Sequence, residues 1–121
     1  MSYTDNIRPY VEAEINLAEQ AHAAGNSSKA FTHLENAHVL GQNSTRLHVR
    51  THWLMLRWSV RERQWRELLG QLLRIVGATT KTAVGLVPTG NTGGANVSPF
   101  KPMPVKPELA EIMERARNAP L

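Results

Sequence analysis

The residues with the clearest chemical potential are histidines, gathered in one short stretch of a 121-residue chain. Four of the five histidines lie between His33 and His52. Glu35 precedes His38 by three residues, and His48 precedes His52 by four. On helices, residues at these spacings occupy neighbouring positions on one surface. Imidazole and carboxylate groups together suit zinc, iron, manganese, nickel or copper(II), so the stretch indicates a transition-metal site.

Hydrophobic periodicity assigns these residues to helices. Apolar side chains recur at helical spacing through most of the first 84 residues, and Asp5 or Asn6 is the expected cap of the first helix. That helix carries Glu14 in the middle of its apolar stripe, between Val11 and Ala18. A carboxylate there departs from the pattern, and such departures are typical of functional sites. The predicted helices cover residues 7–24, 28–40, 45–61 and 62–84.

The distances of these residues from the turns predict which of them meet. In an antiparallel hairpin, residues equally far from the turn lie at the same height. If Asn26 is the centre of the first turn, Glu14 and His38 are each twelve residues from it. If Asn43 is the centre of the second, His38 and His48 are each five residues from it. We therefore expect Glu14, His38 and His48 in one layer.

Two further candidate ligands lie close to this layer. The same reasoning places Glu35 and His52 about one helical turn away, roughly 5–6 Å. Gln42 and Asn43 are candidate hydrogen-bond partners that would orient the imidazoles. The predicted metal ligands are Glu14, Glu35, His38, His48 and His52.

Two classes of function fit this pattern. A bound metal with open coordination positions would make the protein an oxygen-activating or hydrolytic enzyme, whereas a filled site would make it a metal carrier, sensor or buffer. The alternative is a helical-hairpin module for protein interaction, in which a buried network of His and Glu is structural. The sequence leaves open whether the protein is an enzyme, which metal binds, and the oligomeric state.

Composition excludes other kinds of site. The chain has no cysteine, so it has no disulfide, thiolate ligand or catalytic thiol. The net charge is +4, and basic residues interleave with Trp53, Trp58 and Trp65. Such residues usually form a solvated helix face, so nucleic acid is disfavoured as a partner. No run approaches ~20 apolar residues and no signal-peptide layout is present, so we expect a cytoplasmic protein without a membrane span.

The expected fold is all-α. We predict an antiparallel four-helix bundle made of two helical hairpins, similar to a tetratricopeptide pair, within one domain over residues 1–121. Residues 1–85 form the bundle, and 107–118 form a short C-terminal helix. Residues 86–106 are rich in glycine and proline, nearly uncharged, and contain Val97 and Phe100 as apolar anchors. We predict that this segment is an ordered loop covering the bundle.

Three strings carry a family resemblance. They are HLENAHVLGQ at 33–42, HVRTHWLMLRW at 48–58, and TKTAVGLVPTGNTGGANVSPFKPMP at 80–104. Together with their surroundings they resemble a small bacterial domain family that has no assigned function. The resemblance extends over nearly the whole chain and implies a short stand-alone protein. It implies no activity and assigns no catalytic residue.

Overall fold

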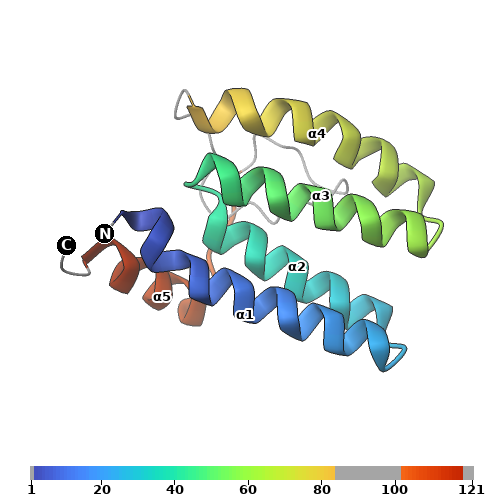
Figure 1. Ribbon diagram of the computed structural model, residues 1–121, viewed down its shortest axis with the longest axis horizontal. Coiled ribbons are helices and arrows are strands. Elements are labelled where there is room, and N and C mark those ends of the chain that lie inside the picture. Colours follow the sequence, from blue (N-terminus) through green and yellow to red (C-terminus); the bar gives the residue numbers. More distant parts are fainter. Residues whose placement is uncertain (1, 84–101, 119–121) are drawn as a thin grey trace.

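A computed structural model describes residues 2–83 and 102–118, except for the side chains of 78–83 (Figure 1). These residues form helices and no strand, so the predicted all-α class is confirmed. Most of the predicted covering loop at 86–106 lies outside the described residues; its last five residues have no regular secondary structure. The helices are α1 (Tyr3–Ala23), α2 (Ser27–Gly41), α3 (Thr45–Arg61), α4 (Trp65–Ala83) and α5 (Pro107–Asn118).

The helices are arranged as two adjoining hairpins. Helices α1 and α2 form the first hairpin, α3 and α4 form the second, and the two hairpins join mainly through α2 and α3. Figure 1 shows the four helices side by side in chain order, with α5 across the first hairpin, where it contacts α1 and α2. Among the described helices, α4 contacts only α3. No described helix has the length and apolar content needed to span a bilayer.

Polar residues in the turns set where the helices begin. Ser2, rather than Asp5 or Asn6, caps α1: its Oγ accepts a hydrogen bond from the Asp5 N–H at 3.2 Å, so α1 begins four residues before the predicted start. Asn26 caps α2 in the same way, and Ser44 caps α3. These side chains satisfy N–H groups that have no partner within the helix. They therefore fix the register of the helices that carry the histidines.

Both hairpins turn through a residue with positive φ. In the first turn this residue is Gly25, with φ of 79°. In the turn between α3 and α4 it is Arg63, with φ of 53°, and the N–H of Gln64 donates to the Ser59 carbonyl at 2.9 Å. The pattern is that of a Schellman motif, which usually requires glycine. Because no glycine, proline or asparagine marks the turn between α3 and α4, the predicted start of the fourth helix at residue 62 is wrong by three residues.

Packing between the first hairpin and α5 forms the larger apolar cluster. The buried stripe of α1 contains Ile15 where Glu14 was predicted. Burial raises the pKa of the Tyr3 phenol, an effect that Arg117 and Asn43 oppose, and the hydroxyl donates to the Leu40 carbonyl at 3.3 Å. This contact ties the start of α1 to the end of α2. The buried members of the cluster are Ile7, Val11, Ile15, Ala37, Val39, Leu40, Leu47, Leu109, Met113 and Ala116.

Candidate metal centre

Three imidazoles converge between α2 and α3. His38 comes from α2, and His48 and His52 come from α3. The Nε2 atom of His38 lies 2.9 Å from that of His48 and 3.1 Å from that of His52, and the last two are 3.2 Å apart. All three residues are buried, with at most 4% of their surface exposed. Among the described residues, they form the group whose donor atoms are close enough together to hold one ion.

The second turn brings these residues together. Helix α2 ends at Gly41 and α3 begins at Thr45, so the centre of the turn is Asn43, as predicted. His38 and His48 are equally distant from it and therefore lie at the same height. Gly41 suits the close approach, because a Cβ at that position would lie 3.0 Å from the Cβ of Leu47. A side chain there would force Leu47 to shift by a few tenths of an ångström in the turn that supports the site.

Helix α4 contributes a residue that orients one of the imidazoles. His52 Nδ1 lies 2.6 Å from Gln71 Oε1, and Gln71 Nε2 donates to Glu67 Oε2 at 2.7 Å. A carboxylate only accepts, so the amide nitrogen of Gln71 must face Glu67 and its oxygen must face His52. His52 therefore carries its proton on Nδ1, which leaves the Nε2 lone pair directed at the other two histidines. Metal-binding histidines are oriented by partners of this kind.

A charged pair lies on the same inner side of α4. Burial lowers the pKa of the Arg74 guanidinium, and the nearby Glu67 carboxylate opposes this shift. Glu67 thus has two roles, since it accepts a hydrogen bond from Gln71 and stabilises a half-buried cation. The series of hydrogen bonds from His52 through Gln71 therefore ends at a carboxylate, Glu67, that also interacts with the Arg74 charge.

The three Nε2 atoms are arranged in a way that hydrogen bonds alone do not satisfy well. A neutral imidazole nitrogen holds either a proton or a lone pair, and His52 Nε2 holds a lone pair for the reason given above. It can accept a proton from His38 or His48, but protons on both of those Nε2 atoms would face each other at 2.9 Å, and with a single proton two lone pairs must share it. A cation between the three nitrogens would satisfy all of their lone pairs at once.

The distances also suit coordination of one ion. Zinc binds histidine nitrogen at about 2.0–2.1 Å, and other first-row ions bind at similar lengths. Nitrogens separated by 2.9–3.2 Å are close enough that His38, His48 and His52 would all bind the same ion at such lengths. The three histidines would therefore hold the ion and leave room for a further ligand.

Glu14 lies outside the histidine group and has other partners. His33 Nδ1 donates to Glu14 Oε2 at 2.7 Å, and Asn36 Nδ2 donates to the same oxygen at 3.4 Å. The centre of the first turn is residue 25 rather than Asn26, because α1 ends at Ala23 and α2 begins at Ser27. This one-residue change moves the register by two, so Glu14 is level with Asn36 and not with His38.

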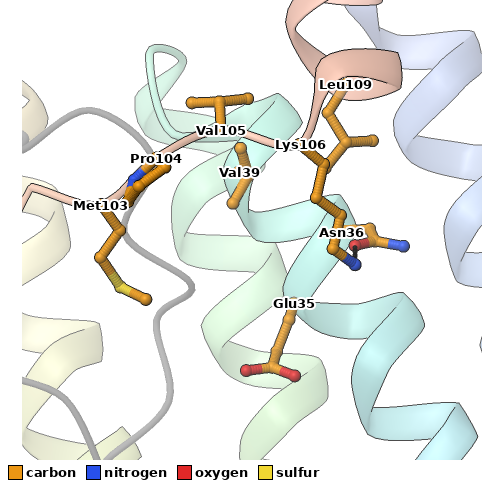
Figure 2. Close-up of a pocket in the computed structure, with 8 residues that line it drawn as sticks. All are labelled: Glu35, Asn36, Val39, Met103, Pro104, Val105, Lys106 and Leu109. Atoms are coloured by element: carbon orange, nitrogen blue, oxygen red, sulfur yellow. Dashed lines mark hydrogen bonds between the residues drawn. The ribbon is translucent and has the colours of Figure 1, made fainter.

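Glu35 also lies outside the group of three histidines. It lines a pocket of about 230 Å³ between α2 and the segment that leads into α5. Figure 2 shows its carboxylate on α2, one turn before Val39, in a pocket also bordered by Met103 and Lys106. Lys106 Nζ donates to Asn36 Oδ1 at 2.8 Å, which holds this segment against α2.

Sequence reasoning missed Gln71. The expected orienting partners were Gln42 and Asn43, but Gln42 is 1% exposed and its amide atoms have no hydrogen-bond partner among the described residues. The signal for Gln71 was present: it is a polar residue in the most apolar helix, four positions after Glu67. Only the packing of α4 on α3 reveals that its side chain meets His52.

We expect Gln71→Met to weaken metal binding by about 10–100-fold, the usual effect of removing a partner that orients a metal-binding histidine. Methionine preserves the volume of the side chain but cannot accept the proton of His52 Nδ1. The matched control is the exchange Gln71→Glu with Glu67→Gln, because the carboxylate at 71 can still accept that proton while the amide at 67 donates to it, with the net charge unchanged. Competition with a chromophoric chelator measures both affinities. Equal affinity in the wild type and Gln71→Met would contradict the orienting role.

Comparison with protein-family models matches residues 5–113 to the family described as protein of unknown function (DUF3703). No curated protein and no solved structure matches the chain. The matched region contains all three converging histidines, Gln71 and Glu67. Because the match extends over most of its length, the chain belongs to the DUF3703 family.

Proposed function

We propose that this protein binds one transition-metal ion through the Nε2 atoms of His38, His48 and His52. The observation that carries the proposal is the convergence of these three buried nitrogens to within 3.2 Å of one another. Buried polar groups are costly unless they are satisfied, and three imidazoles sharing one point are best satisfied by a cation. The Gln71 contact supports the proposal, since it sets the tautomer that a metal-binding histidine needs.

The donor set narrows the class of metal. Three imidazoles suit zinc, copper, iron or nickel better than calcium or magnesium, which prefer oxygen ligands. The chain has no cysteine, so thiolate coordination is absent. Three nitrogen donors would leave at least one position of a four-coordinate ion for a further ligand. We therefore propose a divalent first-row ion with room for an additional donor, whether from solvent, a substrate or the chain itself.

Metal analysis of protein purified without an affinity tag tests this function. We expect close to one equivalent of a single transition metal per chain, or uptake of one equivalent of Zn²⁺ by protein stripped with chelator. Isothermal titration should give one site. Protein that contains only trace metal and takes up none would show that the histidines form a structural network.

Cobalt substitution tests the coordination positions beyond the three nitrogens. Co²⁺ in the site should give visible absorption whose intensity reports whether its geometry is tetrahedral or octahedral. If one position holds an exchangeable ligand, azide should shift this spectrum. A spectrum that azide leaves unchanged would show that the remaining positions are closed, while the metal-binding function would stand.

A further inference from the structure

The outer side of α4 is an apolar surface on a helix that is already packed on its other side. Gln71 is fully buried against the histidine site, so the inner face of α4 is defined by contact with α3. Large apolar side chains lie on the opposite face, each between 49% and 73% exposed. We define this outer α4 stripe as Trp65, Leu69, Leu72, Leu73 and Val76.

The spacing of the stripe is that of a helix-pairing seam. Trp65, Leu69, Leu72 and Val76 follow one another at intervals of four, three and four residues. These intervals keep apolar side chains along one line of a helix and are those used where two helices pack together along their length. Leu73 widens the line by one position. Because the stripe contains no charged residue, its occupant must be apolar as well.

The position of α4 in the fold explains why the stripe has no cover among the described helices. The four helices lie in chain order and α4 is the last of them, so it contacts α3 alone (Figure 1). In stacked helical folds, the terminal helix presents a polar outer side when the stack ends there. Here the outer side is the apolar one, so α4 has the character of an inner helix of a longer stack.

We propose that the outer α4 stripe is the interface of a homodimer in which α4 of one copy packs against α4 of a second copy. A straight apolar seam is self-complementary, which a two-fold symmetric interface requires. The five side chains expose on the order of 600 Å² in total, at the upper limit for the largest apolar patch of a typical monomer. Two copies would together bury roughly 1,200 Å², about the minimum of stable protein interfaces.

The surface is independent of the metal proposal, because it lies on the face of α4 opposite Gln71, the residue through which α4 contacts His52. Its edge also favours a partner helix: Gly70 and Gly77 are seven residues apart on the same side of α4 and border the stripe next to Leu73. Glycine lets two helix backbones approach closely. The side chain of Leu73 in one copy would be received beside these glycines in the other.

Analytical ultracentrifugation of the full chain tests the proposal. The wild type should be a dimer at micromolar concentration, and Leu69→Lys with Val76→Lys should raise the dimer dissociation constant at least ~100-fold, as expected for central interface residues. Both positions are exposed in one copy, at 62% and 73%, so the folded monomer should tolerate the change. Circular dichroism should give the same helix content for the variant and the wild type.

A matched control uses the same residue types elsewhere. Leu17→Lys with Val60→Lys replaces a leucine on α1 and a valine on α3, which are 41% and 52% exposed. This variant should dimerise as the wild type does. A wild type that stays monomeric at all concentrations would overturn the proposal. A monomer that sediments with anionic phospholipid vesicles would overturn it too, because the stripe would then bind lipid rather than a second copy. A dimer unaffected by the α4 substitutions would overturn it as well.

Discussion

His48→Ala combined with His52→Ala should reduce metal affinity by at least about 1,000-fold, well beyond the ~10–100-fold that loss of an orienting partner causes. The double change removes two of the three converging nitrogens and leaves His38 as a single donor. Chelator competition on stripped protein measures the loss, and elemental analysis of freshly purified protein should show it as an empty site.

Glu14→Gln is the control for that experiment. The Glu14 carboxylate pairs with His33 across the α1–α2 hairpin, so its loss should leave metal affinity unchanged. Glu35→Gln tests the other carboxylate of the sequence-predicted ligand set, and we expect no change because Glu35 is not part of the three-histidine group. The proposal would be contradicted by equal metal content in the wild type and the double histidine variant. A loss of affinity in either carboxylate variant would return that residue to the ligand set.

Metal removal should destabilise the protein strongly. A ligand that binds only the folded state contributes about 4 kcal/mol when its free concentration is 1,000 times its dissociation constant. For a domain of this size, that corresponds to a fall in melting temperature on the order of 10–20 °C after chelation. In the metal-free protein, the three buried nitrogens must also face one another without a cation.

Scanning calorimetry with and without chelator measures this difference in melting temperature. The double histidine variant is the internal reference, because its transition should not respond to Zn²⁺ or to chelator. Acid should narrow the gap in the wild type, since protons compete with the metal for the same nitrogens. Identical transitions for the wild type with saturating Zn²⁺ and with chelator would argue against a site that is coupled to folding.

Much of the fold was predictable from local pattern. Hairpins of amphipathic helices followed from hydrophobic periodicity, and Asn43 lies at the centre of the second turn, as its polar surroundings indicated. The meeting of His38 with His48 followed from counting residues on each side of that turn. A tight turn between two regular helices leaves little freedom in register, so a short count is reliable when the turn is located correctly.

The first turn shows how sensitive such a count is. Moving its centre by one residue, from Asn26 to Gly25, shifts the pairing of α1 with α2 by two residues. Glu14 then meets Asn36 and His33, and its flexible side chain reaches the edge of the apolar stripe, where these partners satisfy it. A position within a stripe indicates the side of a helix on which a residue lies, but the reach of a long side chain decides what it contacts.

By itself, the sequence determined the helical class, the turn at Asn43, and the three histidines that lie before and after that turn. Tertiary structure decided the rest of the site. His52 receives its orientation from Gln71, nineteen residues away on α4, and the link depends on the angle at which α4 packs against α3. Arg63, with its left-handed backbone conformation, turns the chain between the two helices, and side-chain packing along their interface determines how α4 lies on α3. Local spacing therefore identifies residues that share a helix face or a tight turn, whereas contacts between faces of different helices depend on the packing of all the side chains between them.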